Sequence, residues 1–217
     1  MIVTIDGPAG AGKSSVSRQL AARIGFQYLD TGAMYRALTW WVLEQGADPQ
    51  DQEAVAELAR EIDIHFDGIR VLVDHQDVSQ AIRSPQVTGA VSEVADNPKV
   101  RQVMVARQRE LAQTGDYVCE GRDQGTVAFP HAECKIFLTA SANERAQRRC
   151  RQLIEQGESA ELEEVLAAQN KRDQRDENRP VGKLVKAAGS IEVLTDGMDF
   201  QQVVDRLEEI VRQELGR

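Results

Sequence analysis

The chain has few aromatic residues: phenylalanine, tryptophan and tyrosine together make up 5% of its 217 residues. A protein that binds single-stranded nucleic acid needs aromatic side chains on which bases can stack. Lysine and arginine form no basic block either, and the formal net charge is −9. These two absences argue against nucleic acid as a partner.

Cysteine and long apolar runs are also scarce. Cys119, Cys134 and Cys150 are odd in number and show no C-x-x-C spacing, so the sequence indicates neither a disulfide framework nor a zinc site. No apolar run approaches the roughly 18 residues that a membrane-spanning helix needs. No signal-peptide pattern precedes Gly7. We therefore expect a cytoplasmic protein with no membrane partner. We also expect the protein to be a monomer.

The acidic charge is concentrated in one segment. Residues 40–80 contain ten acidic residues and only two arginines, and so carry −8 of the net charge of −9. The rest of the chain carries almost no net charge, but several of its arginines lie close together in the sequence. Such groups suit an anionic ligand that is bound locally.

The N-terminal segment MIVTIDGPAGAGKSS carries the most specific pattern. An apolar run over residues 2–5 is followed by G-x-x-x-x-G-K-[ST] over residues 7–14 and by a helical pattern over residues 14–24. A strand, a glycine-rich turn and a helix in this order direct backbone N–H groups and the helix dipole at one point. Lys13 can reach the β- and γ-phosphates, and the Ser14 hydroxyl can ligate Mg²⁺. The sequence predicts a phosphate-binding loop (P-loop).

Strand and helix patterns alternate along most of the chain, which predicts an α/β fold with a parallel sheet covered on both faces. An Asp67-Gly68 turn between residues 62–66 and 69–73 predicts an antiparallel hairpin that interrupts the alternation. The predicted strands of the parallel sheet are residues 2–5, 26–29, 117–120, 134–138 and 191–194. The predicted helices are residues 14–24, 32–44, 51–61, 85–95, 98–114, 142–156, 161–177 and 200–215.

Two segments at strand ends carry charged side chains. In YLDTGAMYR (residues 28–36), Asp30 can cap a helix and Arg36 could clamp a second phosphate. In EGRDQGT (residues 120–126), Arg122 could meet a phosphate, and the following carboxylate a base or ribose. Taken alone, the first segment is compatible with ordinary helix capping, and the second with a solvated ion pair.

Two helices carry arginines on one face. In the first, Arg145, Arg148 and Arg149 have i, i+3, i+4 spacing. In the second, Arg172 and Arg179 flank Asp176, which continues an apolar stripe and so is predicted to point inward. A buried carboxylate needs partners, which neighbouring arginines and a ligand hydroxyl could supply.

Four motifs occur in this order: GPAGAGKS, YLDTGAMYR, EGRDQGTVAFPHA followed by KIFLTAS, and KRDQRDENR. With them, over essentially its whole length, the chain resembles the bacterial cytidylate kinases of the nucleoside monophosphate kinase group. The resemblance implies a P-loop NTPase fold of three layers with a parallel central sheet, a monophosphate-binding insertion and a small helical lid. It implies a core of residues 1–31 and 98–217 with a lid at about 142–180, and a monophosphate-binding region of residues 32–97 with its hairpin insertion at about 63–83.

The resemblance also assigns roles by position. Lys13, Arg122, Asp123 and Arg179 are implied to be catalytic, and Ser14 to lie near Mg²⁺. ATP would be held by Gly7, Pro8, Ala9, Gly10, Ala11, Gly12, Lys13, Ser14, Ser15 and Arg148, although which lid arginine contacts phosphate stays open. The monophosphate pocket would include Thr31 and Tyr35, and the CMP phosphate would be held by Arg36, Arg122 and Arg179. The cytosine base would be read by Ser92, Arg101 and Asp123. The pentose would be contacted by Arg172 and Asp176.

The expected reaction is ATP + (d)CMP to ADP + (d)CDP, in pyrimidine metabolism. Phosphoryl transfer needs positioning and charge neutralisation, which fits a chain with many arginines and no recognisable nucleophile. Two alternatives stay open: a kinase for another acceptor such as UMP or AMP, and a P-loop switch that hydrolyses nucleotide to regulate a partner.

Overall fold

The computed structural model describes residues 1–155 and 157–216, which form two compact units. Unit 1 is built from Met1–Leu29 and the described part of Ala112–Arg217, and unit 2 from Asp30–Leu111. Each unit has its own buried apolar residues and is described separately below.

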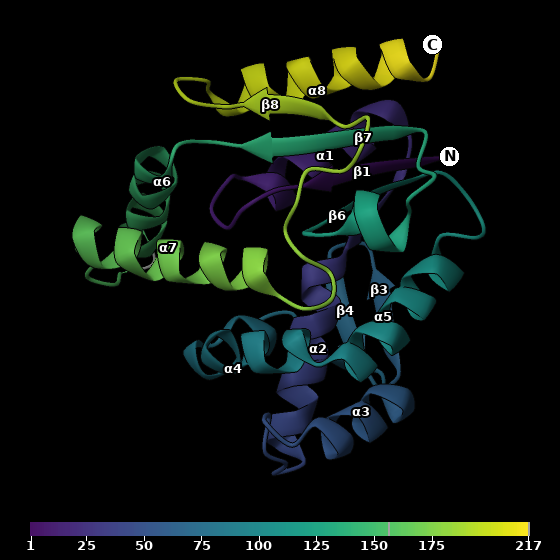
Figure 1. Ribbon diagram of the computed structural model, residues 1–217, viewed down its shortest axis with the longest axis vertical. Coiled ribbons are helices and arrows are strands. Elements are labelled where there is room, and N and C mark those ends of the chain that lie inside the picture. Colours follow the sequence, from purple (N-terminus) through teal and green to yellow (C-terminus); the bar gives the residue numbers. More distant parts are fainter. Residues whose placement is uncertain (156, 217) are drawn as a thin grey trace. The chain divides into compact units, whose positions relative to one another are not determined.

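Unit 1 contains a five-stranded sheet in the order β2-β6-β1-β7-β8. Figure 1 labels four of these strands, β6, β1, β7 and β8. β1 lies at its centre and runs parallel to both neighbours, with Val3 opposite Val118 on one side and Cys134 on the other. Four of the five β1 residues are buried, because a central parallel strand is covered on both faces. The strands are β1 Ile2–Asp6, β2 Gln27–Asp30, β6 Tyr117–Gly121, β7 Cys134–Thr139 and β8 Ile191–Leu194.

In the described part of unit 1, four α-helices and one π-helical turn accompany this sheet. α1 and α8 pack against each other, and the core joins Leu20 of α1 and Leu207 of α8 to Ile5 and Ile136 of the sheet. α6 and α7 pack side by side beyond the end of β7 (Figure 1). These elements are α1 Lys13–Ile24, the turn η2 Gln124–Ala128, α6 Ala142–Glu155, α7 Leu162–Asn178 and α8 Phe200–Glu214.

Unit 2 is mainly helical, with a small antiparallel sheet in the order β3-β4-β5. The predicted hairpin is confirmed: Ile64 pairs with Val73 and Asp67 with Arg70. α2 packs against α4, and α3 against α5. The elements are α2 Thr31–Glu44, α3 Gln52–Glu61, β3 Ile64–Asp67, β4 Arg70–Val73, β5 Gln76–Asp77, the 3₁₀ turn η1 Ala81–Arg83, α4 Pro85–Asp96 and α5 Pro98–Leu111.

The α/β fold predicted from the alternation is confirmed, and the predicted helices and strands of the sheet differ from the observed bounds by a few residues at most. The last residue of the predicted helix 142–156 lies outside the described residues. Among the described residues, no helix combines the length and the apolar character needed to cross a membrane.

Candidate functional site

The loop from β1 to α1 has the backbone of a phosphate-binding turn. Gly7, Gly10 and Gly12 all have positive φ angles, of 153°, 77° and 86°. A Cβ atom on Gly7 would lie 1.9 Å from the carbonyl oxygen of Leu138, and one on Gly10 would lie 2.5 Å from Nε2 of Gln169. The backbone carbonyl leaves no room for a side chain at Gly7, and the positive φ favours glycine at Gly10. The loop leads to the N-terminus of α1, where unpaired N–H groups and the helix dipole attract anions.

Lys13, the first residue of α1, is 5% exposed and donates from Nζ to the carbonyl oxygen of Pro8 at 2.8 Å. Burial, together with repulsion from Arg122 and Arg172, lowers the pKa of its ammonium to about 7. The Glu120 carboxylate raises this pKa and so offsets part of the effect. Three cations therefore crowd the start of α1. An anion of high charge would relieve their mutual repulsion.

Two carboxylates at strand ends border the loop, and sequence analysis gave neither of them a role. Glu120, at the end of β6, accepts a hydrogen bond from Ser14 Oγ at 2.5 Å. Asp6, at the end of β1, accepts from the backbone N–H groups of Gln124 at 2.8 Å and Gly125 at 2.7 Å. Because burial outweighs these bonds, the pKa of Asp6 is raised to about 6. Asp6 thus fixes the segment that directly follows Arg122 and Asp123.

Asp176 of α7 is the centre of an arginine cluster. It is 3% exposed, which confirms its predicted inward position. Arg122 donates from Nε to its Oδ2 at 2.9 Å, and Arg179 from Nη2 to its Oδ1 at 2.5 Å. Burial alone would raise its pKa, but Arg122, Arg179 and Arg172 hold the pKa below its ordinary value. The ionised carboxylate orients two guanidinium groups on different segments of unit 1.

The arginines of α6 have different surroundings. Arg145 is 6% exposed and bonds to Ala9 of the P-loop and to Asp173 of α7. Arg148 donates from Nη1 and Nη2 to the hydroxyl and carbonyl oxygens of Thr195, at 2.9 and 2.8 Å, and pairs with Glu144. Arg149, the third arginine of the predicted face, is exposed.

Five of the residues assigned to the acceptor lie in unit 2. The guanidinium of Arg101 stands over the ring of Tyr35, 5.4 Å from its centroid, so the structure brings these two together. Arg36 donates to Thr88 Oγ1 at 3.0 Å. Thr31 is buried at the start of α2, and Ser92 is partly exposed on α4.

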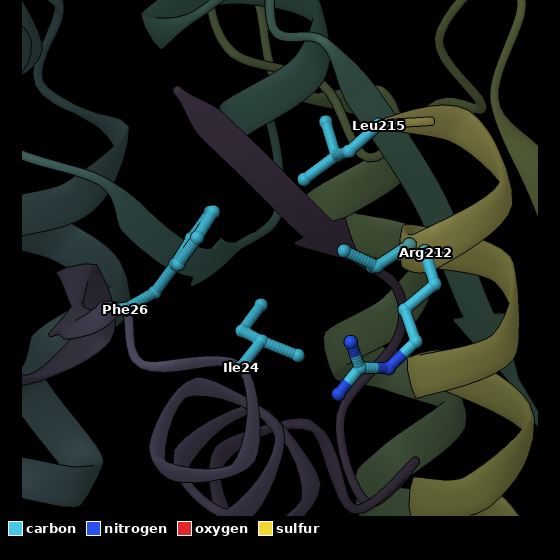
Figure 2. A pocket seen from close by; sticks show the side chains of 5 residues that line it. Ile24, Phe26, Arg212 and Leu215 are labelled. Carbon is cyan, nitrogen blue, oxygen red and sulfur yellow. The ribbon is translucent and has the colours of Figure 1, made fainter. Parts of the chain in front are cut away.

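A cavity of about 50 Å³ lies between the C-terminal ends of α1 and α8 (Figure 2). It is much smaller than the pockets of several hundred Å³ that hold small-molecule ligands. It lies at the opposite end of α1 from Lys13, so it contributes nothing to the P-loop. Its lining residues are Ile24, Phe26, Val211, Arg212 and Leu215.

Solved structures resemble the chain in fold. The crystal structure of TT1252 from Thermus thermophilus is 19% identical, with a TM-score of 0.50 over 99% of this chain and 97% of that one. An uncharacterized protein from Eubacterium ventriosum is 12% identical, with a TM-score of 0.54 over 100% and 99% of the two chains.

Sequence comparison identifies the family. The family profile described as cytidylate kinase matches residues 3–213. A cytidylate kinase of Rhodopirellula baltica is 52% identical over 98% of this chain and 93% of its own length. A bifunctional pantoate ligase/cytidylate kinase of Synechococcus elongatus is 48% identical over 97% of this chain, which spans only 42% of that relative. The chain, with its P-loop and its arginine cluster, therefore belongs to the cytidylate kinase family and is a kinase.

Proposed function

We propose that this kinase transfers the γ-phosphoryl group of ATP to CMP or dCMP, giving ADP and CDP or dCDP, in the pyrimidine metabolism of the cytoplasm. One observation in unit 1 carries the proposal for the reacting groups: Arg122 and Arg172 interact electrostatically with both Lys13 and Asp176, and Arg122 also donates to Asp176 at 2.9 Å. So many cations beside one P-loop suit a reaction in which two phosphate groups meet.

The donor nucleotide would bind at the P-loop, over residues 7–15. Backbone N–H groups at the start of α1 would hold the phosphates, and Lys13 would contact the transferred phosphoryl group. Arg148, on the lid helix α6, would also bind ATP. The Ser14 hydroxyl beside the Glu120 carboxylate is a pair of hard oxygen ligands that fits Mg²⁺, which keeps waters and phosphate oxygens as its other ligands. When bound, Mg²⁺ would neutralise charge on the phosphate oxygens.

For the acceptor, we propose that the cationic residues hold the phosphate and that polar residues select the base. Arg122 and Arg179 already share Asp176, so their guanidinium groups are oriented before a ligand arrives. Pre-oriented groups lose little freedom on binding, which favours catalysis by positioning. The proposed phosphate ligands are Arg36, Arg122 and Arg179, the base readers Ser92, Arg101 and Asp123, the pentose contacts Arg172 and Asp176, and the pocket residues Thr31 and Tyr35.

The proposal is tested by measuring ADP release with CMP, dCMP, UMP, AMP or no acceptor, at fixed Mg²⁺ and ATP. We expect the highest kcat/KM with CMP or dCMP. A higher value with UMP or AMP would replace the proposed acceptor. Equal ADP release with and without acceptor would indicate a nucleotide hydrolase in place of a kinase for monophosphates.

A further inference from the structure

The tip of the P-loop is held by two charged side chains from the lid helices. Both polar groups of Ala9 are engaged: its carbonyl oxygen accepts from Arg145 Nη1 at 2.9 Å, and its N–H donates to Asp173 Oδ1 at 3.3 Å. The two side chains also pair with each other, Nη1 to Oδ2, at 2.6 Å. Arg145 comes from α6 and Asp173 from α7, and the two residues are 6% and 8% exposed. We call this arrangement the loop clamp.

The loop clamp is fixed by further contacts. Arg145 Nε donates to the carbonyl oxygen of Ala140 at 3.0 Å, and Gln169 of α7 donates to the carbonyl oxygen of Arg145 at 3.3 Å. At the next loop residue, Gly10, an added Cβ would lie 2.5 Å from Nε2 of Gln169, so the Gln169 side chain packs closely against the loop. The lid helices therefore contact the loop at two consecutive residues.

We infer that Arg145 and Asp173 are positioning residues for the donor nucleotide, a role that rests on the proposed function of the P-loop. The orientation of one peptide in a glycine-rich loop directs the peptides that follow, and those N–H groups are the ones that meet phosphate. By fixing both sides of Ala9, the loop clamp holds the loop in the shape that accepts phosphate. Nucleotide affinity then depends on α6 and α7 through the shape that the loop clamp gives the loop.

A purely structural role for the pair predicts something different. An ion pair that only joins α6 to α7 needs no bond to the P-loop, and a buried ion pair is by itself weak evidence for stability. If it served only that purpose, its loss would lower stability and affect ADP and CMP binding alike. The bonds to Ala9 predict a selective loss of nucleotide binding at the P-loop.

Two conservative variants separate these cases. Arg145→Lys keeps a cation opposite Asp173, but a single ammonium cannot reproduce a guanidinium fork that reaches Ala9, Ala140 and Asp173 together. Asp173→Asn keeps one acceptor oxygen and loses the charge. The matched controls are Arg151→Lys on α6 and Glu164→Gln on α7, since both residues are exposed. ADP and CMP are titrated separately by calorimetry into each variant, after thermal melts have shown that it is folded.

We expect each clamp variant to bind ADP about tenfold more weakly, to bind CMP within twofold of the original protein, and to exchange amide hydrogens faster over residues 7–13. ADP affinity within twofold of the original in a folded variant would overturn the inference, as would equal losses for ADP and CMP. If one clamp variant does not fold, the other decides. The original protein is assayed for CMP phosphorylation in parallel, so failure of the proposed function appears there, while the ADP titrations still decide the role of the loop clamp.

Discussion

Lys13 donates a hydrogen bond from Nζ to the carbonyl oxygen of Pro8, a residue of the same loop, at 2.8 Å. The ammonium is thus held against the backbone of its own loop, and it is buried near other cations. Its position costs free energy, because both burial and like charges disfavour the charged form. Two predictions about the donor site depend on this lysine.

Lys13→Met should lower turnover by about 10²-fold or more, the usual cost of losing a preorganised electrostatic contact to a transferring group. The methionine keeps the apolar stem, so the thermal melting temperature should not fall. Steady-state kinetics with CMP and Mg-ATP, with melts on the same sample, make the measurement. Near-normal turnover in the folded variant would refute the role of Lys13 in phosphoryl transfer.

Nucleotide binding should be coupled to proton uptake by Lys13. Its pKa of about 7 means that the side chain is largely neutral at pH 8, whereas a bound polyphosphate favours the ammonium and raises the pKa. Binding at pH 8 should therefore take up a proton, and uptake should fade below pH 6, where the lysine is already charged.

Calorimetric titrations of ADP in two buffers with different ionisation enthalpies measure this uptake, and Lys13→Met is the control. The variant should take up fewer protons than the original protein at pH 8. The same uptake in both proteins would assign the proton to another group.

The raised pKa of Asp6 predicts how the free energy of unfolding depends on pH. Its pKa is raised by burial to about 6 from 3.8, so between these values the folded state binds more protons than the unfolded state. The free energy of unfolding contributed by this group therefore falls as pH rises through that window, by about 3 kcal/mol in total. Asp6→Asn does not titrate and supplies the reference.

The difference in unfolding free energy, original protein minus Asp6→Asn, should thus decrease between about pH 4 and pH 6.5. Urea unfolding at several pH values in this range measures it. A constant difference would show that Asp6 titrates normally, which would also weaken the view that it is desolvated beneath the segment after β6.

Much of unit 1 could be predicted because the periodicity of apolar residues reports burial directly. Asp176 was predicted to point inward from its place on the α7 stripe, and it does. β5 was missed for a local reason: the turn before it uses Asp74 and His75, with φ angles of 47° and 67°, where glycine or asparagine would ordinarily mark such a turn.

The clamp could not be predicted from spacing. The i, i+3, i+4 pattern places Arg145, Arg148 and Arg149 near one another, but it does not say what the neighbouring helix offers to each. Asp173 lies 28 residues after Arg145, and only the packing of α6 against α7 brings them within 2.6 Å. Glu120 and Asp6 carried a weaker signal. Asp6 is the last residue of β1 and Glu120 the penultimate residue of β6, and each is followed by a glycine. A carboxylate buried at such a place costs free energy unless it is hydrogen-bonded.

Asp123 is the residue that we expect to discriminate between bases. It is 3% exposed and lies two residues after the end of β6, immediately before the turn η2. Cytosine presents an amino donor where uracil presents a carbonyl, so a buried carboxylate attracts the first and repels the second. Discrimination by buried polar contacts of this kind can reach several kcal/mol.

Asp123→Asn should therefore lower kcat/KM for CMP far more than for UMP, because the amide can offer an N–H to the uracil carbonyl and loses charge toward the cytosine amine. Steady-state kinetics with both acceptors at fixed Mg-ATP give the ratio, and Glu164→Gln, an exposed carboxylate on α7, is the control. A ratio of CMP to UMP efficiency that drops by about tenfold or more would support base reading by Asp123. Equal losses for both acceptors would instead indicate that Asp123 organises the phosphates or the metal, and base recognition would then rest on Ser92 and Arg101.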